Sequence, residues 1–233
     1  MTIAIIGAME PEVAILKDNI SNLEVTKIAN YEYFSGQING QDVVLVQSGI
    51  GKVASAVATT LLINNFNPQY VINTGSAGGF DSALKVGDIA IGNELVHHDV
   101  DVTAFNYEFG QVPNMPARFV ADETLIALTE EAIAELNDIN CKIGLVATGD
   151  SFMCDPKRIE ETRQQFPDML AVEMEGAAIA QVCHQMSTPF IVIRSLSDIA
   201  GEESPMSFDS YLEVASKNSS ALVMNLLKKI SER

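Results

Sequence analysis

Two glutamates, Glu173 and Glu175, are separated by a single residue in the segment LAVEMEGAAIAQVC, residues 170–183. The apolar residues before them predict a buried strand, and the small apolar residues after them predict a buried helix. A carboxylate buried without a partner costs roughly several kcal/mol. Two carboxylates at one strand end therefore call for a chemical explanation.

Two further carboxylates follow apolar strands elsewhere in the chain. Glu12 lies in GAMEPEV, and Asp198 lies in RSLSDIA. Taken alone, Glu12 fits an acid that complements a helix dipole, and Asp198 fits a helix cap or a surface turn. Together with Glu175, however, they would meet at one edge of a parallel sheet. Cleavage of a glycosidic bond needs separated carboxylates of this kind, because one takes a proton from water and another protonates the leaving group.

Two glycine-rich loops follow predicted strands. SGIGKVA, residues 48–54, matches the dinucleotide pattern G-x-G-x-x-A, but the next strand ends in Asn73-Thr74-Gly75, without the acidic residue that would bind the ribose of NAD. We therefore favour a tight strand-to-helix turn for this loop. In the second loop, NTGSAGGF at residues 73–80, a ligand could approach the backbone N–H groups closely. Together the loops predict a pocket for a small molecule.

The segment HHDVD, residues 97–101, contains two histidines in a row. Neighbouring residues of a strand point to opposite faces, so His97 and His98 cannot both reach one ion. The only other histidine, His184, lies on a predicted helix. We predict no metal site and no cofactor.

Composition limits the class of partner. The chain has 233 residues, of which 31 are acidic and 14 are basic, and its formal charge is −17. Such a charge disfavours nucleic acid and anionic membranes, which bind proteins through Lys and Arg. It also keeps a protein soluble. We expect the partner to be a neutral or cationic small molecule, or another protein.

Other features bear on the compartment. The three cysteines form no CxxC pair and predict a reducing environment without a disulfide framework. The amino terminus lacks the basic start and the cleavage site of a signal peptide. Polar residues interrupt the uncharged stretch 53–80, so its apolar parts are too short to cross a bilayer. We expect a cytoplasmic protein that spans no membrane.

Strand patterns alternate with helical patterns along the whole chain, and residues 31–48 predict a hairpin that turns at Asn39-Gly40. Helices after most strands favour a largely parallel sheet covered on both faces, and the hairpin makes the sheet mixed. We expect one α/β domain over residues 1–233. Further predicted strands are 2–9, 70–75, 87–102, 142–149, 170–173 and 190–198. Predicted helices are 11–20, 54–65, 122–137, 176–183 and 207–230, the last with a capping box at Ser210 and Glu213.

Several of these segments resemble motifs of the 5′-methylthioadenosine/S-adenosylhomocysteine nucleosidases, a family of the nucleoside phosphorylase superfamily. The segments are IIGAMEPEV, SGIGKVASA, INTGSAGG, VGDIAIG, DVDVTAFNYEFGQVP, AVEMEGAAIAQVCH and IRSLSDIA. The resemblance covers essentially the whole chain. It implies a three-layer α/β/α sandwich with a central mixed sheet.

The resemblance also implies an activity, which is the irreversible hydrolysis of the N-glycosidic bond of adenine nucleosides. Methylthioadenosine and S-adenosylhomocysteine would yield adenine and a 5-thio-substituted ribose, and 5′-deoxyadenosine would be cleaved as well. The implied context is methionine salvage and the removal of by-products.

By resemblance, the carboxylates have distinct roles. Glu12 would be the general base that activates water, and Asp198 would be the general acid that protonates adenine at N7, which requires a raised pKa at Asp198. Glu175 would accept hydrogen bonds from the ribose hydroxyls, and Met174 would line the sugar site. For Glu173 two possibilities stay open: either a break at Met174 separates its role from that of Glu175, and Glu173 supports the site from behind, or both glutamates face the pocket.

The remaining site residues also follow from the resemblance. Phe152 would stack on adenine, and the Met153 backbone would read the purine edge. Further expected substrate-binding positions are Met9, Ile50, Ser76, Gly78, Arg194, Ser197 and Phe208. A second subunit would lend Val102, Phe105 and Pro113 to the 5′-alkylthio pocket, which predicts a homodimer. For each apolar residue taken alone, ordinary core packing is the alternative.

Two other functions are weighed against hydrolysis. A nucleoside phosphorylase would use phosphate, which related phosphorylases hold with arginines, including one at the position of Asn73. Without such an arginine, water is the favoured nucleophile. A non-catalytic nucleoside-binding module would need neither Glu12 nor Asp198.

Overall fold

The computed structural model describes residues 1–136, 139–201 and 204–233. Its strands are β1 (Thr2–Gly7), β2 (Ser21–Ile28), β3 (Tyr31–Ile38), β4 (Gln41–Gln47), β5 (Tyr70–Gly79), β6 (Ile89–His97), β7 (Phe119–Val120), β8 (Cys141–Thr148), β9 (Met169–Glu173) and β10 (Phe190–Ile199). Its helices are α1 (Glu10–Asp18), α2 (Lys52–Phe66), α3 (Glu123–Ile133), α4 (Pro156–Gln165), α5 (Gly176–Gln185) and α6 (Ser204–Ser231), with a 3₁₀ turn at Thr103–Phe105.

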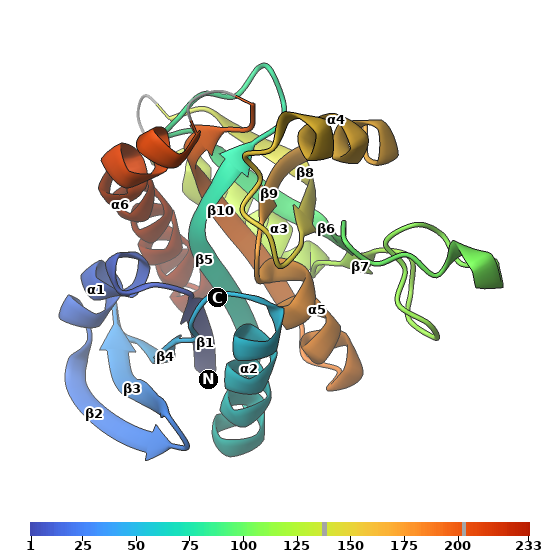
Figure 1. The fold of residues 1–233 in the computed structure, drawn as a ribbon. Coiled ribbons are helices and arrows are strands. Elements are labelled where there is room, and N and C mark those ends of the chain that lie inside the picture. Colours follow the sequence, from blue (N-terminus) through green and yellow to red (C-terminus); the bar gives the residue numbers. More distant parts are fainter. Residues whose placement is uncertain (137–138, 202–203) are drawn as a thin grey trace.

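The strands form one mixed sheet in the order β10-β6-β8-β9-β5-β1-β4-β3-β2, and β7 pairs with β6 (Figure 1). β1 lies parallel to β4 and β5, whereas β2, β3 and β4 form an antiparallel meander. The long strand β5 also pairs with β10 along its length and with β9 at its carboxyl end. As a result, β5, β10, β6, β8 and β9 close into a ring of strands.

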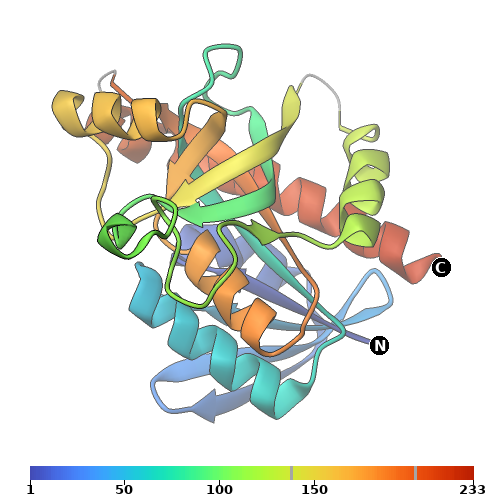
Figure 2. The same cartoon turned by 90° about the vertical axis from the view of Figure 1, so that its right-hand side faces the viewer.

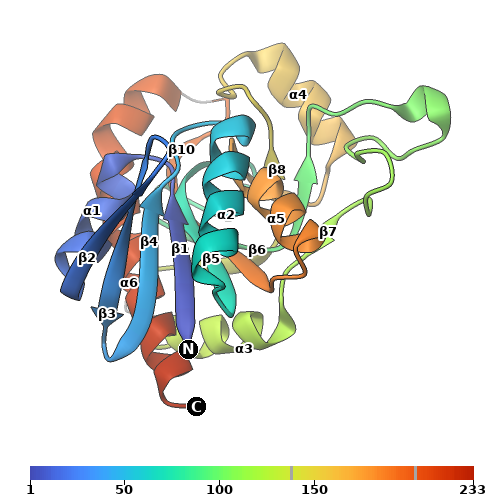
Figure 3. The same ribbon diagram turned by 90° about the horizontal axis from the view of Figure 1, so that it is seen from below.

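Helices cover both faces of the sheet (Figure 3). On one face α1, α3 and α6 pack together, and Leu16, Leu128 and Leu226 belong to the buried cluster beneath them. On the other face α2 and α5 lie side by side (Figure 2), where Leu62 and Ile179 belong to a second buried cluster. This arrangement confirms the expected three-layer α/β/α sandwich.

Local predictions meet with different outcomes. The hairpin turn is confirmed, since Asn39 and Gly40 have φ angles of 51° and 79° between β3 and β4. The capping box at Ser210 is wrong, because α6 begins at Ser204 and Ser210 lies inside the helix. The predicted helix 122–137 ends at Ile133, and Asn137 lies outside the described residues.

The sequence patterns also made no prediction for β2, the two-residue strand β7, α4 and the 3₁₀ turn. Within the described residues, no helix combines the length and the apolar character that crossing a membrane requires.

Candidate active site

A cavity of about 420 Å³ opens where β1, β5, β9 and β10 come together. Most of the residues expected to bind substrate line it: Met9, Glu12, Ile50, Ser76, Gly78, Phe152, Met174, Glu175, Ser197, Asp198 and Phe208. Ala8, Ala77, Val172, Glu173 and Asp209 complete the lining. Met153 is buried beside an adjoining hollow of about 40 Å³, and Arg194 lies fully buried behind the cavity wall. The sequence therefore identified residues that are distant in the chain but close in space.

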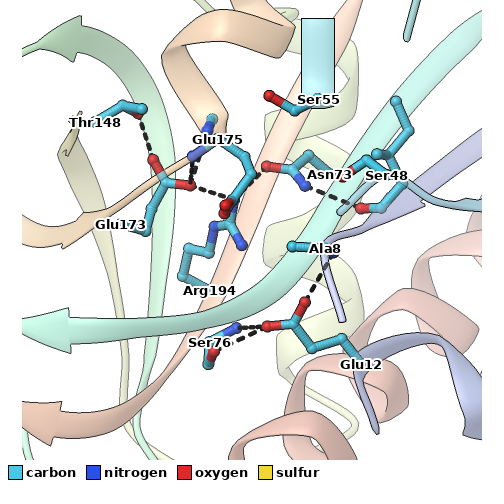
Figure 4. Close-up of polar contacts among 12 residues, drawn as sticks. Ala8, Glu12, Ser48, Ser55, Asn73, Ser76, Thr148, Glu173, Glu175 and Arg194 are labelled. Atoms are coloured by element: carbon cyan, nitrogen blue, oxygen red, sulfur yellow. Dashed lines mark hydrogen bonds and ion pairs between the residues drawn. The ribbon is translucent and has the colours of Figure 1, made fainter. Parts of the chain in front are cut away.

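Glu12 lies at the start of α1, after the short turn that follows β1. One carboxylate oxygen accepts hydrogen bonds from the backbone N–H groups of Ala8 and Met9, at 2.8 and 3.0 Å. The other accepts from the backbone N–H and the hydroxyl of Ser76, at 2.9 and 2.8 Å (Figure 4). The predicted helix start is confirmed, and the contacts to β5 fix this carboxylate in one orientation at the cavity.

Asp198 lies within β10, where a bulge shifts the register between Leu196 and Asp198. An extra residue in a strand re-aims the side chains around it. The Ser197 hydroxyl donates to Asp198 Oδ1 at 2.9 Å. On the paired strand, a Cβ at Gly78 would lie 3.1 Å from Asp198 Oδ2, so glycine leaves room for the carboxylate. As expected, Asp198 lies at the end of a strand, one residue before β10 ends, and it lines the cavity.

Glu175 is the residue immediately before α5. Its Oε1 accepts a hydrogen bond from the backbone N–H of Gly51 at 2.8 Å. Gly51 has a φ of 96°, a left-handed conformation that favours glycine, and it ends the loop between β4 and α2. The SGIGKVA loop is thus the expected strand-to-helix turn, and it directs a backbone donor at a glutamate 124 positions later.

The pKa of Glu175 is shifted by its buried position and by neighbouring charges. Burial raises its pKa to about 8, and the nearby negative charge of Glu173 acts in the same direction. Arg194 and the Gly51 N–H lower the pKa, and Glu12 raises it. Without a ligand, this carboxyl group is therefore poised to hold a proton near neutral pH.

Glu173 is the last residue of β9, and its side chain is 2% exposed. The Thr148 hydroxyl donates to its Oε1, and the Arg194 guanidinium donates to its Oε2. The same Oε2 accepts from the backbone N–H groups of Glu175 and Gly176, at 2.9 and 2.7 Å. Of the two possibilities for Glu173, this geometry favours the first: β9 ends before Met174, and the two carboxylates share Arg194 but otherwise have different partners.

Arg194 is a fully buried cation between these acids (Figure 4). Its Nη2 donates to Asn73 Oδ1 at 2.6 Å and to Glu173, and it lies 3.7 Å from Glu175 Oε2. A Cβ at Gly75 would lie 2.3 Å from Arg194 Nη1 and 2.9 Å from Glu12 Oε1. Only glycine therefore lets the guanidinium pass this close to the strand.

Aromatic residues line the cavity toward its open side. The rings of Phe152 and Phe208 lie edge to face with their centroids 5.7 Å apart and their planes at 79°. Both rings are partly exposed, and Ile50 is exposed beside them. The flat face of an aromatic ligand such as a purine suits these surfaces.

The three residues expected to serve a second subunit lie elsewhere in this chain. Val102, Phe105 and Pro113 belong to the segment between β6 and β7, which reaches away from the sheet (green in Figure 1). They do not line the cavity of their own chain, and Phe105 is 75% exposed.

His97 and His98 lie at the base of this segment. Burial lowers the pKa of both imidazoles, and His97 Nε2 lies 3.0 Å from Gln181 Oε1. Among the described residues, no group of three or more His, Cys, Asp or Glu side chains could hold a metal ion.

Sequence reasoning missed three contributors to the site. Gly51 was noted only as part of a tight turn, Thr148 was not singled out, and Asn73 was noted only as a place without arginine. Only Gly51 carried a signal, the glycine-rich loop. Thr148 and Asn73 act through tertiary hydrogen bonds to partners 25 and 121 positions away, and local patterns do not report such bonds.

Comparisons with known proteins identify the family of this chain. Residues 2–228 match the model of the phosphorylase superfamily. A 5′-methylthioadenosine/S-adenosylhomocysteine nucleosidase of Pseudoalteromonas translucida (strain TAC 125) is 60% identical over 231 residues, which are 99% of this chain and 98% of the relative.

Two solved structures are similar over nearly their whole length. The nucleosidase of the same kind from Colwellia psychrerythraea 34H, in complex with adenine, has a TM-score of 0.97 and 56% identity, covering 98% of this chain and 95% of that one. The one from Neisseria meningitidis, in complex with methylthio-immucillin-A, has a TM-score of 0.96 and 46% identity, covering 97% and 98%. The chain therefore belongs to the 5′-methylthioadenosine/S-adenosylhomocysteine nucleosidases, a family of nucleoside hydrolases within the phosphorylase superfamily.

Proposed function

We propose that this protein hydrolyses the N-glycosidic bond of 5′-methylthioadenosine and S-adenosylhomocysteine, and also that of 5′-deoxyadenosine. The observation that carries the proposal is the pairing of Glu12 and Asp198 in one cavity. Among the described residues that line this cavity there is no lysine or arginine. Water therefore suits the site better as nucleophile than phosphate does.

Glu12 is the proposed general base. A general base must be held within hydrogen-bonding reach of the proton that it takes. The four hydrogen bonds from Ala8, Met9 and Ser76 hold the carboxylate in place before substrate arrives. Such preorganisation supports a role in orienting and deprotonating the attacking water.

Asp198 is the proposed general acid, which protonates adenine at N7 so that the base departs neutral. This role requires a protonated Asp198 in the substrate complex, and its raised pKa stays a prediction. The Ser197 hydroxyl, donating to Asp198 Oδ1, supports a fixed orientation of the acid. A proton transfer of this kind contributes typically ~10²–10⁴ in rate.

Glu175 is the proposed acceptor for the ribose hydroxyls, since a carboxylate has two oxygens to offer a vicinal diol. Met174 would pack against the sugar, and Phe152 and Phe208 would contact adenine, with the Met153 backbone at the purine edge. The acidic surroundings favour the positive charge that develops on the sugar in an oxocarbenium-like transition state.

We also propose that the protein acts as a homodimer. Val53 and Val57 of α2 are 76% and 44% exposed, and Phe105 stands exposed on the segment beyond β6. The ion pair of Lys52 with Asp99, at 2.6 Å, holds the base of that segment beside α2. Large apolar side chains exposed on α2 and on this segment favour a protein partner. A second subunit would then receive Val102, Phe105 and Pro113 at its 5′-alkylthio pocket.

The proposed context follows from the products. Release of adenine from methylthioadenosine and S-adenosylhomocysteine fits methionine salvage and by-product removal in the cytoplasm.

Adenine release by variants of the two acids tests the proposal. We expect Glu12→Gln and Asp198→Asn each to lose about 10²-fold or more in kcat, because each loses one proton transfer. Folding and adenine binding should survive in both. The controls are Glu10→Gln on the exposed start of α1 and Asp155→Asn at the start of α4, which remove the same charges outside the cavity. Turnover at the wild-type rate in either active-site variant would exclude the assignment.

A further inference from the structure

Helix α5 begins directly at the cavity wall, and its first backbone N–H groups need partners because no preceding turn supplies them. The N–H groups of Glu175 and Gly176 donate to Glu173 Oε2, at 2.9 and 2.7 Å. The N–H of Ala177 donates to the Thr148 hydroxyl at 2.7 Å. The ends of β8 and β9 thus hold the start of α5.

The Glu173 carboxylate is fully engaged in this task. Besides the two N–H groups, it accepts from Thr148 and Arg194, so both of its oxygens are occupied. A Cβ at Gly176 would lie 3.0 Å from Glu173 Oε1, which shows how closely the helix start packs on this group. Its side chain is only 2% exposed, so Glu173 offers a ligand little surface although the residue lines the cavity.

Glu173 and Glu175 are linked through the backbone. The N–H that Glu173 accepts belongs to Glu175 itself, while the Glu175 side chain reaches the opposite way to the Gly51 N–H at 2.8 Å. One carboxylate therefore fixes the main chain from which the other extends. A shift of the Glu173 carboxylate would therefore shift the Glu175 carboxylate relative to the cavity.

We infer that Glu173 is a positioning residue, which holds the start of α5 so that Glu175 presents its carboxylate to the ribose hydroxyls of a nucleoside. The inference rests on the proposed function only for the identity of the group that Glu175 binds. It answers why this strand end carries two acids: one binds the protein, and the other binds the ligand.

The charge of Glu173 shifts the pKa of Glu175, and a purely structural role of Glu173 would not produce this effect. The charged groups that act on Glu175 are Glu173 from β9, Arg194 from β10 and Glu12 from α1, and Asp198 and Asp209 line the same cavity. The Gly51 N–H faces it from the start of α2. Because the Glu173 charge raises the pKa of Glu175, removing that charge lowers the pKa. It also leaves Arg194 with Glu175 as its remaining acidic neighbour, which acts in the same direction.

The test is the pH dependence of kcat/KM for methylthioadenosine, which reports the free enzyme. For the wild type we expect kcat/KM to fall as the pH drops below about 8, where Glu175 takes up a proton. This fall is the acid limb of the profile. In Glu173→Gln we expect kcat/KM to fall about 10- to 100-fold, as for loss of a hydrogen bond to a charged group. We also expect the acid limb to move down by about one pH unit or more. Adenine, which lacks the ribose, should bind with unchanged affinity.

Thr148→Val is the matched control, because it disturbs the same helix start without removing a charge. We expect it to weaken activity and stability while the acid limb stays in place. If Glu173→Gln does not fold, Glu173→Asp keeps the charge but shortens the reach. That variant should raise KM for the nucleoside without moving the limb.

Two failures can be told apart. If Glu175→Gln leaves kcat/KM for methylthioadenosine unchanged, the proposed role of Glu175 in ribose binding fails. If Glu175→Gln removes the limb, yet Glu173→Gln neither moves it nor changes KM, the positioning role alone is overturned.

Discussion

Glu173 and Glu175 are chemically identical and differ only in what their carboxylates touch. Glu173 accepts hydrogen bonds from Arg194, Thr148 and two backbone donors, whereas Glu175 has one backbone donor and a longer ion pair with Arg194, at 3.7 Å. The sequence alone indicates that two buried carboxylates at one strand end must have binding partners or a chemical role. It could not predict which glutamate binds the protein and which faces the cavity. Thr148 and Arg194 come from β8 and β10, and only folding brings them to the end of β9.

The raised pKa of Glu175 predicts a pH-dependent stability. Its pKa is about 8 in the folded protein against 4.5 for an ordinary glutamate, so the folded chain holds a proton that the unfolded chain releases. The stability from this group is complete below about pH 4.5 and is lost as the pH rises through about 8. The Gln side chain does not titrate, so Glu175→Gln does not lose this stability. Between about pH 5 and pH 8 the Tm of Glu175→Gln should therefore rise relative to that of the wild type. The rise is roughly 2–4 °C for each kcal/mol by which the free energy of unfolding of the wild type falls.

Thermal unfolding of the ligand-free proteins across this range measures the difference. The control is Glu10→Gln, an exposed acid at the start of α1, whose Tm difference from the wild type should stay flat. A Tm difference for Glu175→Gln that does not change with pH would contradict the pKa.

At the scale of elements, the direction of β9 decides how the site is built. The sequence predicts that Glu12, Glu175 and Asp198 meet because parallel strands end at one edge. Glu12 and Asp198 do follow this logic, since β1, β5 and β10 are parallel. Glu175 does not, because β9 runs antiparallel to β5 and reaches the cavity from the other side. The ring of strands makes this approach possible, and no local pattern encodes such a closure.

The elements without a prediction have physical explanations. β2 lies at the edge of the sheet and is exposed along nearly its whole length, so only the short alternation of Leu23 and Val25 with polar residues could have indicated it. In α4 only Ile159 and Thr162 are buried, which leaves no apolar stripe to recognise. The strands and helices of the core, in contrast, followed their hydrophobic patterns. Ser210 satisfied a capping pattern by spacing alone, inside a longer helix.

At the scale of the whole molecule, the exposed apolar residues near α2 predict an assembly. We expect the wild type to sediment as a dimer and Val53→Glu to sediment as a monomer with a raised KM for methylthioadenosine, because a charge would be buried in the interface. Val25→Glu is the matched control, since Val25 is 55% exposed on β2 and the added charge is the same. A wild type that is monomeric and fully active at assay concentration would contradict the dimer.

The central claim is that water, and not phosphate, receives the ribosyl group in this cavity. Chromatography of the products after purified protein meets methylthioadenosine, with and without phosphate, tests it most directly. The cavity lining described above, without lysine or arginine, predicts adenine and free methylthioribose at the same rate in both conditions. A sugar 1-phosphate that forms only when phosphate is present would contradict the account.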